Sequence, residues 1–225
     1  MIISVHIRKC AGTTFKASLK DCYKKRLLFD YGDEVGSNWP SSIEKRKVRL
    51  ANAKASKSSI EKDFDIIHGH FFRNKYDFLG CRLVFATFLR DPVSRVLSNY
   101  FYLKRNPDRA NPDALLVHKF DFSLEEFASH PDNQNLQSHY LQTDGLQELS
   151  FVGVVEEYDQ SIKRFNEVFD CELVAGQNLN VNDDASRQYE VPQKTIDVIV
   201  ENNLKDIQLY KKARNDLLGN RLSWV

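Results

Sequence analysis

The feature that most constrains the fold is the regular alternation of short apolar segments with amphipathic ones. Five apolar runs rich in β-branched residues are predicted as strands, at residues 2–7, 65–68, 82–89, 151–155 and 172–175. Several of them are almost continuously apolar, as expected of strands covered on both faces. Helical patterns follow four of these runs, at residues 13–23, 92–105, 158–169 and 192–218. This alternation predicts an α/β, three-layer fold with a central, mainly parallel sheet flanked by helices.

Two segments interrupt the alternation. Residues 30–62 are polar and rich in Lys and Ser, and a solvated helix is predicted within residues 41–64. Residues 105–148 contain three prolines and short helical pieces such as residues 123–130. We interpret residues 30–62 and 105–148 as excursions from the sheet that shape an acceptor site. The length of 225 residues fits a single domain spanning residues 1–225.

The composition excludes several classes of protein. With 32 basic and 31 acidic residues, the net charge is +1, whereas general nucleic-acid binders carry a strong basic excess. No stretch approaches the roughly 20 apolar residues that a membrane span needs, and the run at 2–7 is too short for a signal peptide. The four cysteines show no metal-binding spacing. We expect a cytoplasmic protein with reduced thiols and without nucleic-acid or membrane partners; nothing in the sequence specifies its oligomeric state.

The first strand leads into the segment HIRKCAGTTF, residues 6–15. Gly12 permits a tight turn, and the amides of Gly12, Thr13 and Thr14 then form an anion site at a helix N-terminus. Lys9 adds a positive charge at the edge of this loop. The loop is P-loop-like but lacks the nucleoside triphosphatase pattern G-x-x-x-x-G-K-[ST]. Taken alone, the segment is equally compatible with a capped turn carrying a surface lysine.

The third strand leads into the segment FLRDPVSRVLSNYFY, residues 88–102. Asp91 is placed to cap the next helix, with Pro92 at its first position. Arg90 ends the strand, and Ser98 follows eight positions later, two turns into the helix. A guanidinium and a hydroxyl in this arrangement can bind a second phosphate. The alternative is that Arg90 pairs with Asp91 or with a backbone carbonyl.

At both segments the sequence resembles the carbohydrate sulfotransferases, and it is similar to the heparan sulfate 2-O-sulfotransferase-like proteins. The similarity continues, in the expected order, in IIHGHFF, FVGVVEEYDQSIKRF, LNVND and DIQLYKKA. The resemblance implies a sulfotransferase of EC class 2.8.2 that uses 3′-phosphoadenosine 5′-phosphosulfate (PAPS) as co-substrate, without a metal. It implies transfer of a sulfuryl group to a hydroxyl of a small-molecule or glycan acceptor.

The resemblance assigns Lys9, Gly12, Thr13 and Thr14 to the 5′-phosphosulfate, and Arg90 and Ser98 to the 3′-phosphate. Lys9 is also implied as the residue that stabilises the leaving phosphate oxygen. The chain departs from the family at Arg8 and Cys10, where the family loop commonly has proline and threonine. Cys10 is a weaker hydrogen-bond donor than threonine.

The acceptor hydroxyl needs a base, and the best candidates are His68 and His70 in the segment DIIHGHFF. Alternation places both imidazoles on one side of an extended chain, and histidine titrates near neutrality. Related glycan sulfotransferases carry a similar HGH segment, and the second histidine is the better match, which favours His70. Glu156 or Glu157 is an alternative acidic base, and a purely structural role for both histidines stays open. A metal site is disfavoured because no third ligand lies near in the sequence.

Asn180, Ser186 and Arg187 fall where related enzymes have a loop near the nucleotide.

Two other functions compete with sulfuryl transfer. A kinase-like phosphotransferase requires a Mg²⁺-holding Ser or Thr directly after a loop lysine and an acidic strand end, and neither is evident. A non-catalytic nucleotide- or glycan-binding protein on the same fold is suggested by the unusual residues Arg8 and Cys10.

Overall fold

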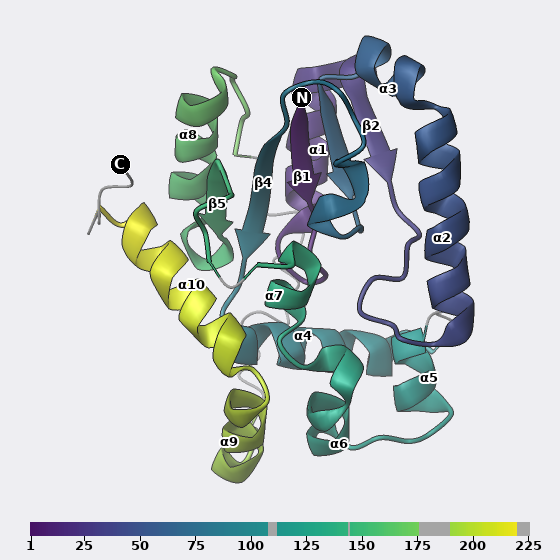
Figure 1. The fold of residues 1–225 in the computed structure, drawn as a ribbon. Helices are drawn as coiled ribbons and strands as arrows, with labels where there is room; N and C mark the ends of the chain where they lie inside the picture. The colour runs from purple at the N-terminus through teal and green to yellow at the C-terminus, as the bar shows by residue number, and fades with distance from the viewer. Residues whose placement is uncertain (108–111, 144, 176–189, 220–225) are drawn as a thin grey trace.

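The computed structural model describes residues 1–107, 112–143, 145–175 and 190–219 (Figure 1). Within them, a parallel five-stranded sheet has the order β2-β3-β1-β4-β5. Its strands are β1 Ile2–Val5, β2 Leu27–Asp30, β3 Ile66–Gly69, β4 Val84–Leu89 and β5 Phe151–Val154. The predicted α/β class, with a central parallel sheet flanked by helices, is confirmed.

The register brings three strand ends to one edge of the sheet. Val5 at the end of β1 lies opposite Gly69 of β3 on one side and Thr87 of β4 on the other. Because all of these strands are parallel, the loops after them open at the same edge. Ligands of open α/β sheets bind outside the carboxyl ends of the strands, where successive connections diverge to opposite sides. The loop after β1 occupies such a position, since β2 and β3 lie on one side of β1 and β4 on the other.

Aromatic residues join the sheet to the helices that cover it. Phe15 of α1 (Gly12–Tyr23) lies with its ring centroid 4.8 Å from that of Phe88 in β4. The Phe15 ring is also 5.3 Å from that of Phe165 in α8 (Tyr158–Phe169). Both helices therefore contribute to one core with β4. The central strands are covered on both faces: Ile3, Ile66 and Ile67 are fully buried, as their continuous apolar character predicts.

The excursions are largely helical. Residues 30–62 contain α2 (Pro40–Ala55) and all but the last residue of α3 (Lys57–Asp63). Most side chains of these two helices are exposed, as predicted. Below the sheet in Figure 1, the helix at Pro92–Arg105 forms a second apolar cluster with the helices at Pro112–His118, Leu124–Ser129 and Gln193–Glu201. The remaining helices are α4 Pro92–Arg105, α5 Pro112–His118, α6 Leu124–Ser129, α7 Leu136–Leu141, α9 Gln193–Glu201 and α10 Leu204–Leu217. Short 3-10 turns are η1 Lys24–Arg26, η2 Arg73–Tyr76, η3 Pro131–Asn133 and η4 Val155–Glu157.

One predicted strand is wrong, and one observed strand has no counterpart in the prediction. Residues 172–175 form no strand, because the side chain of Asn166 bonds the backbone of Leu173 in both directions. Leu173 donates its N–H to Asn166 Oδ1 at 2.8 Å, and Asn166 Nδ2 donates to the Leu173 carbonyl at 2.9 Å. The Asn166 side chain thus forms the backbone hydrogen bonds that a neighbouring strand would otherwise form. The unpredicted strand is β2, only four residues long and preceded directly by the basic run 24–26. The C-terminal pattern at 192–218 forms two helices rather than one.

None of the helices in the described ranges has the length and apolar character needed to cross a membrane.

Candidate active site

The loop between β1 and α1 has an unusual backbone conformation. Lys9 and Ala11 both have left-handed backbone conformations, with φ of 68° and 53°. Ala11 is the N-cap residue of α1; it provides no side-chain hydrogen bond, and the first turn of the helix contains no acidic residue. Amides at such a helix start are satisfied by an anion, which the helix dipole also attracts. The loop therefore fits the phosphosulfate that the sequence predicts.

The residues predicted for this loop have distinct environments. Thr13 is exposed on the first turn of α1, whereas Gly12 and Thr14 are buried. A Cβ atom at residue 12 would overlap the ring of His6, so the imidazole occupies the space of any larger side chain. Gly12 is therefore required here by the contact with His6.

Lys9 faces α4, the helix that begins after Arg90. Its ammonium lies 4.0 Å from the centre of the Tyr102 ring, a favourable cation–π geometry. Tyr102 lies on α4 four residues after Ser98, and residues with this spacing share a helix face. Ser98 is half-buried on this face. Lys9 therefore contacts the helix that carries Ser98.

Arg90 touches the phosphate loop directly. Its Nη1 donates a hydrogen bond to the carbonyl oxygen of Lys9 at 3.2 Å. Its Nε is buried and has no hydrogen-bond partner within the described part of the chain. Asp91 does not pair with Arg90 but caps α4, accepting a hydrogen bond from the amide of Ser94 at 2.8 Å. The predicted cap is confirmed, and the predicted alternative of an Arg90–Asp91 pair is not observed.

Three histidines stack at the edge of the sheet beside the loop. The ring of His6 lies 4.2 Å from that of His70 and 5.3 Å from that of His68, measured between centroids. Tyr31 meets His70 edge-on at 4.9 Å, and its hydroxyl lies 3.1 Å from Nδ1 of His6. The sequence predicts His68 and His70 as a pair, but it gives no sign of Tyr31, which comes from the excursion after β2.

His70 and His68 differ in what they can reach. His70 Nδ1 lies 2.6 Å from the carbonyl oxygen of His6. A carbonyl only accepts hydrogen bonds, so the neutral ring carries its proton on Nδ1 and keeps a lone pair on Nε2. His68 is 1% exposed, bonded through Nδ1 to the Ser4 hydroxyl at 2.8 Å. His70 is only partly buried, so its geometry is the better suited to a base.

Burial keeps these imidazoles neutral. It lowers the pKa of His70 to about 4, with the nearby charges of Arg8 and Lys16 acting in the same direction and the His6 carbonyl opposing them. Burial also lowers the pKa of His68 to about 3 and that of His6 well below its usual value. At neutral pH the three rings are uncharged, which is the state required to accept a proton.

The alternative acidic bases are already engaged elsewhere. Glu156 accepts hydrogen bonds from the amide of Asp91 at 3.0 Å and from the hydroxyl of Tyr210 at 3.1 Å. Glu157 pairs with Arg214 at 3.2 Å. Both glutamates come after β5, which is an edge strand of the sheet. His70 follows β3, which is separated from β5 by β1 and β4. These contacts favour structural roles for the two glutamates.

The two unusual loop residues are anchored in the protein interior. Arg8 forms an ion pair with Asp113 of α5, whose side chain is 3% exposed. The thiol of Cys10 lies 3.6 Å from Oε1 of Gln137 in α7. Burial raises the pKa of Cys10 to about 12, so the thiol stays protonated and is not a nucleophile. Neither Asp113 nor Gln137 stands out in the sequence, because a single polar residue in a short helix has no distinguishing pattern.

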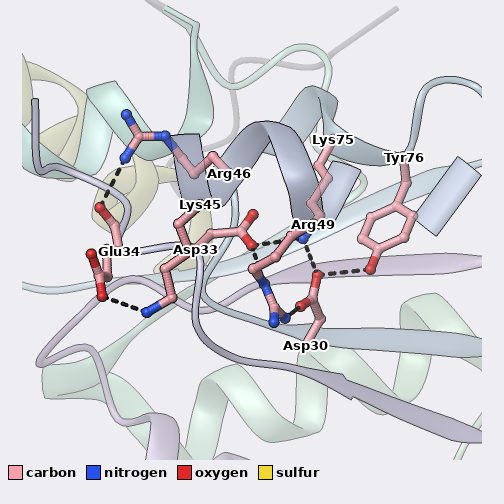
Figure 2. A network of polar contacts seen from close by, with 8 residues as sticks. All are labelled: Asp30, Asp33, Glu34, Lys45, Arg46, Arg49, Lys75 and Tyr76. Carbon is pink, nitrogen blue, oxygen red and sulfur yellow. Dashed lines mark hydrogen bonds and ion pairs between the residues drawn. The ribbon is translucent and has the colours of Figure 1, made fainter. Parts of the chain in front are cut away.

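A buried ionic network holds the excursion that carries Tyr31 (Figure 2). Lys75 is 5% exposed at its side chain and contacts Asp30 at 2.5 Å and Asp33 at 2.8 Å. Arg49 of α2 pairs with the same two carboxylates, and the hydroxyl of Tyr76 donates to Asp30 at 2.8 Å. Although burial opposes ionisation, these partners hold the pKa of Asp30 below its usual value. Tyr31 lies between Asp30 and Asp33 in the sequence. The contacts of these two aspartates therefore fix the backbone that places the Tyr31 ring against the histidines.

The remaining sequence predictions concern the nucleotide loop and metals. Asn180, Ser186 and Arg187 lie outside the described residues. Across the described ranges, no group of three or more His, Cys, Asp or Glu side chains is arranged to hold a metal ion.

Comparison with known proteins identifies the family. A model of the sulfotransferase family matches residues 1–213, and the chain therefore belongs to this family of PAPS-dependent enzymes. Among solved structures, a sulfotransferase from Alicyclobacillus acidocaldarius is similar, with a TM-score of 0.52 and 12% identity over 97% of this chain and 95% of that one. A retinol dehydratase in complex with androsterone and inactive cofactor PAP matches with a TM-score of 0.31 and 14% identity, over 100% of this chain and 82% of that one. No curated protein matched the chain in a sequence search. The first of these structures shows a shared fold.

The histidine cluster predicts acid-sensitive stability. In the unfolded chain the histidines titrate near pH 6.5, whereas their folded pKa values are lower. The unfolded state therefore binds more protons below pH 6.5, and stability present above that pH is lost as the pH falls toward 4. Each such histidine contributes a slope of about 1.4 kcal/mol per pH unit. Urea unfolding between pH 7.5 and 5 measures this slope, and His68→Gln should reduce it. A free energy of unfolding that stays constant over this range would contradict the assignment.

Proposed function

We propose that the enzyme transfers a sulfuryl group from PAPS to a hydroxyl of a carbohydrate or similar small acceptor, with Lys9 and Arg90 binding the donor and His70 acting as base. The observation that carries the proposal is the hydrogen bond from Arg90 Nη1 to the carbonyl of Lys9. It brings the two predicted anion-binding segments close together, as one nucleotide with phosphates on both its 3′ and 5′ positions requires.

The donor supplies an activated sulfuryl group on a phosphate leaving group, and transfer requires in-line geometry and charge stabilisation. The amides of Gly12, Thr13 and Thr14 would bind the 5′-phosphosulfate, with Lys9 neutralising charge on the leaving oxygen. Arg90 would bind the 3′-phosphate through the N–H groups not used by the loop, together with the hydroxyl of Ser98. These roles use fixed donors, so little reorganisation is needed during the reaction.

His70 completes the proposal on the acceptor side. Its Nε2 lone pair would accept the proton of the acceptor hydroxyl as the new S–O bond forms and the bond to phosphate breaks. The bond from Nδ1 to the carbonyl of His6 keeps the ring in the required tautomer. Negative charge bound in the adjacent loop would raise the low pKa of His70 and so strengthen it as a base. The segments 30–62 and 105–148 would shape the acceptor site.

Titration calorimetry with adenosine 3′,5′-bisphosphate and with ATP plus Mg²⁺ tests the donor assignment. We expect binding of the bisphosphate and weaker binding of ATP, because no Mg²⁺-holding residue comes directly after Lys9. Arg90→Ala should weaken bisphosphate binding by about 2–5 kcal/mol, the usual cost of removing one member of a buried charge pair. Lys104→Ala, which removes an exposed cation from the far end of α4, is the matched control. Preferential binding of ATP would overturn the proposal.

Replacement of His70 by glutamine tests the base. Loss of general-base help should lower kcat by about 10²–10⁴-fold while bisphosphate binding stays unchanged. The assay measures labelled sulfate transferred from PAPS onto a panel of saccharides and small alcohols, using whichever acceptor gives turnover. His130→Gln, in a turn away from the histidine cluster, serves as the control. Full turnover by His70→Gln would assign the base to another residue.

A further inference from the structure

Gln137 is a fully buried polar residue at the centre of the site, although it lies in the segment 105–148 that is predicted to serve the acceptor. It belongs to the short helix α7 and has 0% exposure. A buried amide has several hydrogen-bonding groups to satisfy, and leaving them without partners is unfavourable. The partners of Gln137 therefore show what the protein uses it for.

The side chain of Gln137 pairs with the backbone of Arg90 in both directions. The Arg90 N–H donates to Oε1 at 2.9 Å, and Nε2 donates to the Arg90 carbonyl at 2.9 Å. This reciprocal pairing resembles that between neighbouring strands and fixes which end of the amide carries the oxygen. β4 ends at Leu89, so Arg90 is the first residue outside the sheet. Gln137 provides hydrogen bonds to the Arg90 backbone in place of a neighbouring strand.

Gln137 also touches the phosphate loop, through the thiol of Cys10, which donates to the same Oε1 at 3.6 Å. One side chain thus contacts both anion-binding segments. The Cys10 contact is the weaker of the two, because a thiol is a poor donor. The main effect of Gln137 therefore falls on Arg90, whose guanidinium in turn reaches the carbonyl of Lys9.

The backbone of Gln137 is held from the opposite side by Asp206 of α10. The carboxylate of Asp206 is fully buried and accepts hydrogen bonds from the amides of Gln137 at 2.9 Å and Ser138 at 2.8 Å. The hydroxyl of Ser138 donates to the same carboxylate at 2.7 Å. These hydrogen bonds fix the backbone of Gln137. They therefore also restrict the position of its side-chain amide relative to Arg90.

We propose that Gln137 is a positioning residue that sets Arg90 relative to the phosphate loop and so determines the preference of the enzyme for nucleotides bearing a 3′-phosphate. This inference rests on the proposed role of Arg90 as the 3′-phosphate ligand. Gln137 acts through the backbone of Arg90, with its own amide satisfied inside the protein. Without it, the end of β4 loses two hydrogen bonds, and the guanidinium loses its fixed spacing from Lys9.

The test compares adenosine 3′,5′-bisphosphate with adenosine 5′-monophosphate by titration calorimetry, in the full-length protein. The two ligands differ only in the 3′-phosphate, so the ratio of their affinities isolates the Arg90 site. In Gln137→Leu we expect this ratio to fall about tenfold, the scale of one charge-assisted hydrogen bond. Gln134→Leu, the same substitution three residues earlier, removes an amide that donates to the Ser129 carbonyl at 2.7 Å, and it should leave the ratio unchanged.

Two further variants keep the test decisive. Gln137→Glu retains the shape of the side chain but replaces the Nε2 donor with an acceptor, so it should lower the ratio even if Gln137→Leu does not fold. In an Arg90→Ala background, Gln137→Leu should lower the ratio no further, because its effect passes through Arg90. Equal loss of affinity for both nucleotides, or an unchanged ratio in Gln137→Glu, would show a merely structural role and overturn the inference. A wild-type enzyme that does not prefer the bisphosphate would instead refute the proposed function on which it rests.

Discussion

The parallel pairing of β1 with β4 is the constraint on which the site depends. Val5 lies opposite Thr87, and the hydroxyl of Thr87 donates a hydrogen bond to the carbonyl of Val5 at 2.9 Å. Both strands therefore run out of the sheet side by side, one into the phosphate loop and the other into Arg90. The pairing of β1 with β3 brings His70 to the same edge from the other side. Strand order alone therefore brings together the residues that we propose to bind the donor and the residue that we propose as base.

A shell of buried polar contacts surrounds this edge of the sheet. The ion pair of Arg8 with Asp113 ties the phosphate loop to α5, and the amide of Gln137 ties Arg90 to α7. On the opposite side, Lys75 and its two aspartates hold the segment that carries Tyr31. Buried polar contacts of this kind stabilise one arrangement of the chain in preference to others. Such rigid support suits a reaction in which the protein contributes mainly position and charge.

The sequence predicted those parts of the structure that depend on local pattern. The nearly continuous apolar runs of β1 and β4, and the cap and proline at the start of α4, reflect backbone preferences directly. The strand predicted at 172–175 failed because the decisive partner is the side chain of Asn166, in the preceding helix.

The site residues predicted from the sequence lie at strand ends or in the helices that directly follow them. Lys9, His70 and Arg90 each come after an apolar run, whereas Gln137, Asp113 and Tyr31 reach the site from the excursions. The link between Gln137 and Arg90 spans 47 residues of sequence, and no periodicity encodes a contact of that kind. The reason for Gly12 was likewise out of reach, because it depends on where the ring of His6 packs.

The central claim is that two separate segments, one at Lys9 and one at Arg90, hold the two phosphate groups of one nucleotide. Phosphorus NMR of bound adenosine 3′,5′-bisphosphate tests it directly, because the 3′ and 5′ phosphates give separate resonances. Both resonances should shift on binding to the wild-type enzyme. With Arg90→Ala, at saturating protein, only the 3′ resonance should return toward its free position. A 3′ resonance unaffected by Arg90→Ala, or equal changes in both resonances, would contradict the claim.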